Sequence, residues 1–124
     1  MRLRRCGAAF FDACADYGDV VYFSKPADEK FQITTSNMST YYAMITFNTS
    51  EGPVVVDIPA AKGAGIFGSF NDAWEVPAAD FGPEGEDAGK GGKYLLLPPG
   101  YADPIPDGHI PCAWAPSTAI RFCA

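Results

Sequence analysis

Proline and glycine interrupt this chain so often that they leave little room for long helices. The 124 residues include 11 Pro and 13 Gly, spread along the sequence. Proline removes a backbone donor and glycine destabilises a helix interior, so this spacing favours short strands joined by turns. The length suits one domain. We therefore expect a single, mainly β domain.

Four segments rich in β-branched and aromatic residues predict the strands. They are DVVYFSKP, STYYAMITFNTSEGPVVVDIPA, GIFGSFNDAW and KYLLLPPG. The second segment contains two strands, residues 41–47 and 54–58, and the turn residues NTSEGP between them predict a hairpin. The final GHIPCAWAPSTAIRFCA predicts two more short strands, broken at Pro116. Such a succession predicts an antiparallel jelly-roll-like sandwich or barrel.

The N-terminal residues 1–16 predict a short helical lead-in to a β domain over residues 17–124, because Ala and Phe side chains there fit one helical face. A secretory signal is the alternative interpretation, but Asp12 and Asp16 interrupt its apolar stretch. No apolar run reaches the roughly 20 residues that cross a bilayer. We expect no membrane span and a cytoplasmic location by default, with export left open.

Charge argues against one class of partner. The net charge is −6, and Arg2, Arg4 and Arg5 hold three of the nine basic residues, which makes the remaining chain still more acidic. Binding to nucleic acid needs basic side chains that displace phosphate counterions. We therefore expect no nucleic-acid partner.

The four cysteines form no CxxC pair and predict buried free thiols. They are Cys6, Cys14, Cys112 and Cys123. An even count leaves three disulfide connectivities open. The single histidine and the lack of paired ligand spacing disfavour zinc, and we expect no metal and no cofactor.

The acidic, glycine-rich segment over residues 75–92 reads as a long loop, and loops of this length without structure of their own are usually functional or disordered. It fails the phosphate-loop template, because Gly85 and Gly89 enclose three residues where the template needs four. The alternating ligands of a calcium loop are missing too. We predict that its later glycines supply unusual φ angles at the entry to a strand. These glycines are Gly89, Gly91 and Gly92.

Few residues are candidates for chemistry. Asn71, Asp72 and Trp74 combine polar groups with an indole at a strand end, which is typical of a ligand-facing rim. The alternative is that Asp72 caps a turn and Trp74 packs in the core. His109 could act as a general base, but no nucleophile motif accompanies it, so a structural role is favoured.

Several separated motifs occur together in this chain. They are VVYFSKPAD, GPVVVDIPA, NDAWEVPAADFGPEG, GKGGKYLLLPPGY, IPDGHIP and STAIRF, the last containing Arg121. Their order and spacing over nearly all of residues 17–124 resemble the bacterial family called domain of unknown function 1254. The resemblance implies a β-rich, jelly-roll-like domain, usually followed by a second β domain, domain of unknown function 1214. We expect this chain to be a single-domain or truncated member that lacks the usual second domain.

One segment departs from the family pattern. Where this sequence reads TSNMSTYY, the family usually has Thr-Pro-Asn-Asn-Asp-Thr-Pro-Tyr. Asn37, Thr40 and Tyr42 fit that pattern, whereas Ser39 stands in place of the acid. If that acid binds a metal or accepts a proton in relatives, Ser39 cannot supply its charge.

Two functions of different classes follow. The first is a non-catalytic module that binds a small molecule or a partner chain and associates as a homodimer. The second is a hydrolase-like enzyme in which Asp72 performs acid–base work with Lys90 or Lys93. Together these hypotheses give the candidate site residues: Asn37, Thr40, Tyr42, Asp72, Trp74, Lys90 and Lys93.

Overall fold

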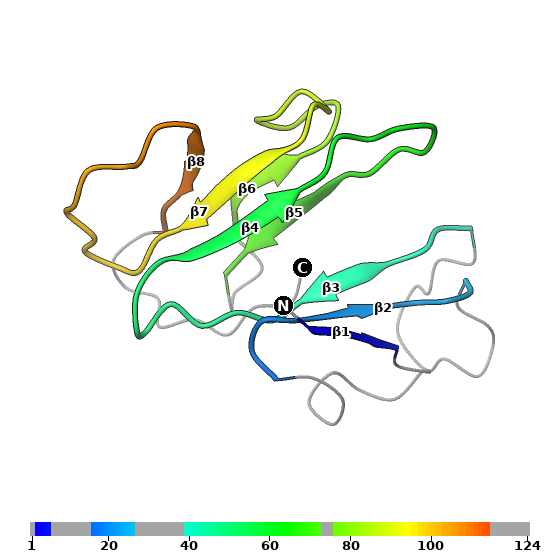
Figure 1. Cartoon of the computed structure of the whole chain (residues 1–124), viewed down its shortest axis with the longest axis horizontal. Helices are drawn as coiled ribbons and strands as arrows, with labels where there is room; N and C mark the ends of the chain where they lie inside the picture. Colours follow the sequence, from blue (N-terminus) through cyan, green and yellow to red (C-terminus); the bar gives the residue numbers. More distant parts are fainter. Residues whose placement is uncertain (1, 6–15, 27–38, 73–75, 115–124) are drawn as a thin grey trace. The chain divides into compact units, whose positions relative to one another are not determined.

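A computed structural model of the chain describes residues 2–5, 16–26, 39–72 and 76–114. These residues form eight strands, and no helix occurs among them (Figure 1). The strands are β1 Arg2–Arg5, β2 Asp19–Tyr22, β3 Ala43–Ile45, β4 Val54–Ile58, β5 Gly68–Asn71, β6 Pro77–Phe81, β7 Gly92–Leu96 and β8 His109–Cys112. The mainly β class predicted from the sequence is confirmed. In the part of the chain that the structure describes, no helix is long and apolar enough to cross a membrane.

The chain divides into two compact units, Met1–Thr46 and Phe47–Ala124. The first unit contains a three-stranded sheet in the order β1-β2-β3, with β1 parallel and β3 antiparallel to β2. The predicted N-terminal helix is not supported, since β1 is extended and residues 6–15 lie outside the described residues. Pairing with β2 stabilises the extended conformation of β1, whereas an isolated short helix is only marginally stable in water.

The second unit is built from two sheets, β4-β7-β8 and β5-β6. Figure 1 shows β5 and β6 as a layer behind β4 and β7. Aromatic rings join the layers: the centroid of Tyr94 lies 5.1 Å from that of Phe70 and 6.3 Å from that of Phe81. Tyr94 and Phe70 are almost fully buried, so these rings form the core of the unit. Ring pairs at such distances each add about 1 kcal/mol beyond the area they bury.

The predicted hairpin between residues 41–47 and 54–58 is wrong, although each run contains a strand. β3 pairs with β2, whereas β4 pairs with β7, placing Val56 opposite Tyr94. The turn residues do form a turn, in which Asn48 Oδ1 accepts a hydrogen bond from Ser50 N at 2.9 Å. Phe47 lies at the end of the first run and belongs to the second unit. Its side chain is buried there, with its ring 6.0 Å from that of Trp114, so the chain leaves the first sheet before β4 begins.

Two further expectations need correction. The segment over residues 75–92 is not one long loop, because β6 lies inside it and pairs antiparallel with β5, with a bulge at Phe70/Asn71. The sheets are not purely antiparallel either, since β7 and β8 run parallel. β8 confirms the first of the two predicted C-terminal strands, and the second, beyond Pro116, lies outside the described residues.

Candidate functional site

The connection between β6 and β7, residues 82–91, folds around one carboxylate, and we call it the Asp87 loop. Asp87 is 7% exposed. Its Oδ1 accepts hydrogen bonds from Gly82 N at 2.7 Å and Gly89 N at 3.4 Å, while its Oδ2 accepts one from Gly91 N at 2.9 Å. Both ends of the loop are therefore bound to the same side chain.

The electrostatics of this side chain are set by opposing effects. Burial would raise the pKa of the Asp87 carboxyl, but the hydrogen bonds from Gly82, Gly89 and Gly91 outweigh it and hold the pKa below its ordinary value of 3.8. The pKa of the nearby Tyr94 is raised to about 12, mainly by burial and then by the negative charge of Asp87. At neutral pH the loop therefore encloses a carboxylate beside a protonated phenol.

Close backbone contacts fix the Asp87 loop against the strands. A Cβ atom on Gly91 would lie 2.5 Å from Ala60 N, and one on Gly85 would lie 2.5 Å from Phe81 Cα. Gly89 and Gly91 have φ values of +72° and +75°, which confirms their predicted unusual φ angles, whereas Gly92 does not share this conformation. The glycines thus let the loop lie directly on its neighbours.

A pocket of about 330 Å³ lies between β6 and the Asp87 loop. Its lining consists of Pro77, Ala78, Ala79, Asp80, Glu84, Gly85 and Glu86. The two walls are tied together, because Asp80 O accepts hydrogen bonds from Glu86 N at 3.0 Å and from Tyr94 Oη at 3.1 Å. Three carboxylates on a fixed wall make this pocket the candidate site.

The acidic side chains of the pocket do not form a metal centre. In the described part of the chain, no three His, Cys, Asp or Glu side chains are grouped as metal ligands. Asp80, Glu84 and Glu86 are all exposed, so their charges face solvent around the pocket. This arrangement suits an organic cation, larger than a metal ion, whose positive charge lies at the rim of the pocket.

The residues that the sequence singled out lie elsewhere. Asn37 and Trp74 are outside the described residues. Thr40 is half-buried in the first unit, where the ring of Tyr42 contacts that of Phe23 edge-on at 6.1 Å. Neither residue lines the pocket of the second unit. Their part in binding stays a prediction.

Asp72 and the two lysines are not brought together. Asp72 is buried, and its Oδ1 accepts a hydrogen bond from Val76 N at 2.9 Å, which is the geometry of a residue that caps a turn. β5 and β7 run in the same direction (Figure 1), so Asp72, after the end of β5, lies at the opposite end of the unit from Lys93. Lys90 is an exposed residue of the Asp87 loop.

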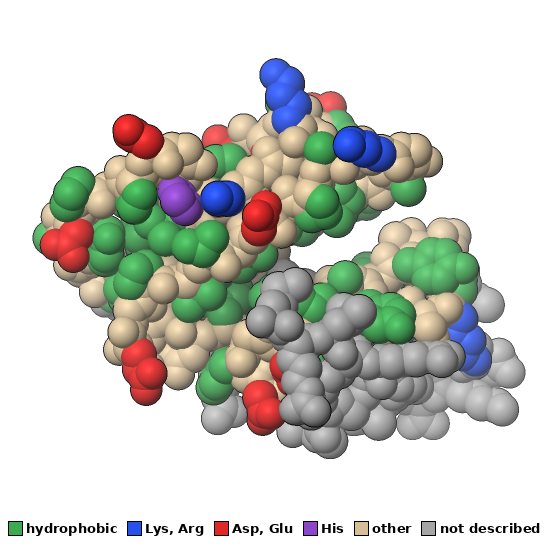
Figure 2. All heavy atoms as spheres, in the orientation of Figure 1, with side chains coloured by type: hydrophobic (Ala, Val, Ile, Leu, Met, Phe, Trp, Pro, Cys, Tyr) green, Lys and Arg blue, Asp and Glu red, His purple; other side chains and the backbone are tan. Residues whose placement is uncertain are grey.

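Lys93 has other neighbours. The strand register places it opposite Asp57 on β4 and opposite His109 on β8. Figure 2 shows a histidine, a lysine and a carboxylate side chain next to one another on the face of the molecule that is turned to the viewer. His109 Nδ1 lies 3.3 Å from Asp107 O, a contact within its own turn that agrees with a structural role.

Cys112 is a buried free thiol, as predicted. Burial first, and the charge of Glu86 second, raise its pKa to about 12. We expect native Cys112 to react with an aromatic disulfide reagent on the order of a hundredfold more slowly than in urea, because the thiolate is the reactive form. A chain with the other three cysteines changed to serine isolates this thiol, and equal rates in both states would contradict the prediction.

Sequence reasoning missed the residues that build the pocket. In the sequence Asp87 is one acid among several in its segment, and Asp80 belongs to a strand that the sequence predicts as loop. Glycines on both sides of Asp87 were the available signal, since a buried carboxylate needs backbone amides that can approach it closely.

Comparison with known proteins finds one match, to a protein family. A family model described as Protein of unknown function (DUF1254) matches residues 18–121. No curated protein matches the chain.

Proposed function

The chain belongs to the DUF1254 family, and we propose that it is a binding module rather than a catalyst, with a small organic cation as its ligand. The observation that carries this proposal is the pocket of about 330 Å³ with Asp80, Glu84 and Glu86 around it. Pockets for small molecules usually begin near this size. An ammonium or guanidinium group supplies the charged donors that carboxylates bind best.

The frame of the pocket supports the same proposal. Glu84 and Glu86 stand on the Asp87 loop, which is fixed at both ends by hydrogen bonds to Asp87. A ligand that binds a fixed wall does not have to order it first, which lowers the entropic cost of binding. The net charge of −6 also attracts cations to the protein as a whole.

The test is a titration with 1,4-diaminobutane, followed by the backbone amide signals of the full chain in nuclear magnetic resonance spectra. We expect shifts confined to residues 78–80 and 84–86, and about a tenfold weaker affinity in the Glu84→Gln, Glu86→Gln double variant. Salt should weaken binding, since the charges are exposed.

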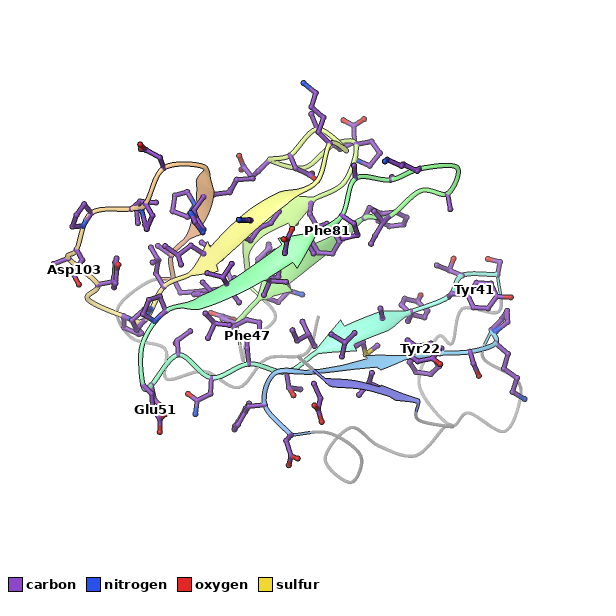
Figure 3. The ribbon with its side chains drawn as sticks, viewed as in Figure 1. Tyr22, Tyr41, Phe47, Glu51, Phe81 and Asp103 are labelled. Carbon is purple, nitrogen blue, oxygen red and sulfur yellow. The ribbon has the colours of Figure 1, made fainter. Side chains whose placement is uncertain are left out.

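Two controls make this result specific. Glu51 is exposed and lies well away from Phe81, the residue after Asp80, as Figure 3 shows. Glu51→Gln should leave the affinity unchanged, and neutral 1,4-butanediol should produce no shifts. Absence of shifts with the diamine, or equal losses in the Glu51 and pocket variants, would refute the proposal.

The two remaining hypotheses, a hydrolase and a homodimer, stay predictions with less support. A hydrolase built on Asp72 with Lys90 or Lys93 needs these groups near one another, and Asp72 and Lys93 lie at opposite ends of the unit. Homodimer formation stays a prediction, because a single exposed apolar side chain such as Val55, 51% exposed, is ordinary on a protein surface.

A further inference from the structure

The edge strands of a sheet have backbone groups without a strand partner on one side, and β4 is such a strand. It comes first in the sheet β4-β7-β8, and among the described residues no strand pairs with its other side. An open edge of this kind is a template for another strand. We propose that β4 pairs antiparallel with β4 of a second copy of this chain, so that the two copies share one continuous sheet.

The hydrogen bonds of β7 show which groups of β4 are already bonded. Leu97 N donates to Cys112 O at 2.9 Å, so Leu97 and every second residue before it direct their backbone groups towards β8. Tyr94 lies at an alternate position and therefore directs its groups towards β4. The register places Tyr94 opposite Val56, and these two residues form a bonded pair.

The neighbours of Val56 consequently face outward. The N–H and C=O of Val55 and Asp57 point away from β7, and the side chains of both residues are exposed. In the described chain, the backbone hydrogen bonds outside the strands include none to these groups. Pro53 and Pro59 flank the strand, and proline has no N–H. The outward donors of this edge are therefore those of Val55 and Asp57, which keeps any added pairing short.

The other edges of the second unit are protected. On β8 the outward positions are His109, whose N donates to Pro106 O at 3.3 Å, and Pro111, which has no N–H. On β6, Asp80 O accepts from Glu86 N at 3.0 Å, so the chain's own loop covers that edge. The pairing of β5 with β6 contains a bulge, a feature that disfavours association through an edge. β4 is therefore the edge best suited to another strand.

A second copy carries a matching edge. With a two-fold axis at Val56, Val55 of each copy bonds Asp57 of the other, and no two carboxylates lie opposite each other. The register already places Asp57 opposite Lys93 of its own copy, so its negative charge has a positive neighbour. On the other face of the sheet, the buried Val56 of each copy would extend the apolar side of the joined sheet. The edge is thus complementary to itself in backbone groups and in charge.

The short pairing predicts a weak dimer, with a dissociation constant on the order of 0.1 mM. Each copy has a net charge of −6, and these charges repel one another as the copies approach. Salt screens the repulsion, so we expect association to strengthen as the salt concentration rises. Salt has the opposite effect on the proposed cation site, which makes the two interactions distinguishable.

The experiment follows the full chain from about 10 μM to about 1 mM by analytical ultracentrifugation and by amide hydrogen exchange. Exchange at the N–H groups of Val55 and Asp57 should slow about fourfold over this range, as the dimer fraction rises. Exchange at Val56 N–H, which is bonded to β7, should not change with concentration.

A pair of variants separates the backbone from the side chain. Val55→Pro removes the outward N–H but no bond to β7, whereas Val55→Ala keeps the N–H and shortens the side chain. We expect Val55→Pro to weaken the dimer at least about tenfold and Val55→Ala less than about threefold. Aromatic circular dichroism checks that both variants fold. Should Val55→Pro not fold, the exchange measurement decides the question on the unaltered chain.

Several results would overturn this inference. They are a monomer at every concentration and salt level, a dimer without slower exchange at Val55 and Asp57, and a dimer that salt dissociates. Equal losses in the two folded variants would also overturn it, because they would assign the contact to the side chain. Titration with 1,4-diaminobutane tests the cation pocket separately, since the outer edge of β4 contributes none of its lining.

Discussion

Asp87→Ala is expected to lower the free energy of unfolding by about 3 kcal/mol, a large share of the stability of a small domain. The substitution leaves the amides of Gly82 and Gly91 without the carboxylate that both now share. Hydrogen bonds to a charged acceptor are among the stronger ones in proteins, and buried amides without partners are costly. Urea unfolding followed by tryptophan fluorescence measures the change.

The adjacent Glu86 provides a matched control for this prediction. Its side chain is exposed, and only its backbone N–H bonds to Asp80 O. Glu86→Ala removes the same formal charge from the same loop and should change the free energy of unfolding by less than about 0.5 kcal/mol. Similar losses in the two variants would show that Asp87 does not anchor the loop through its amide contacts.

The contribution of Asp87 also has a defined dependence on pH. Its pKa is lower in the folded protein than its ordinary value of 3.8, so the unfolded chain binds the proton more readily. The stabilisation is complete above the unfolded-state pKa and is lost as the pH falls through the folded-state pKa. The stability difference between the native chain and Asp87→Asn should therefore shrink below pH 3.8. A difference that stays constant down to acid unfolding would contradict this account.

Gly91→Ala is expected to cost about 3 kcal/mol for two separate reasons. At a φ of +75° a side chain carries a conformational cost of roughly 1–2 kcal/mol. In addition, its Cβ would lie 2.5 Å from both Ala60 N and Ile58 O, so the backbone after β4 would have to shift. The free energy of unfolding by urea gives the magnitude, and the amide signals of residues 58–60 locate the shift.

Gly89 separates these two causes. It has nearly the same φ, +72°, but a Cβ there would approach nothing closer than Pro83 Cα at 3.5 Å. Gly89→Ala should therefore cost only the conformational part, about 1 kcal/mol. If both variants lose the same stability, the close contact with residues 58–60 contributes nothing.

The strands that the sequence predicted best are those whose own residues favour β structure. DVVYFSKP contains β2, and KYLLLPPG contains all of β7 except Gly92. The Val and Tyr side chains of these two runs are typical of strands. β6 was missed because its sequence, PAADF, consists mostly of weak strand formers and becomes a strand through pairing with β5. The wrong hairpin has a related cause: alternation shows which side chains are buried, but not which strand is the partner.

The candidate site was harder to predict than the fold. Asp80, Glu84, Glu86 and Asp87 look alike in the sequence, yet one is buried and three surround a pocket. What distinguishes Asp87 is the position of three backbone amides, and these depend on glycine conformations that the sequence only suggested. Asp72 shows the opposite case, since its turn-capping interpretation was available from the residue type alone.

The anchoring of the Asp87 loop by backbone amides also bears on how such a loop can change over time. An amide is present whatever side chain its residue carries, so the anchor constrains Asp87 and the glycines but not the side chains between them. Those side chains all face solvent: Pro83, Glu84, Glu86, Ala88 and Lys90. The groups that fix the fold and the side chains that face solvent thus occupy different positions of one short segment. Point substitutions at the exposed positions can therefore change the surface of this loop while the frame that presents it keeps its stability.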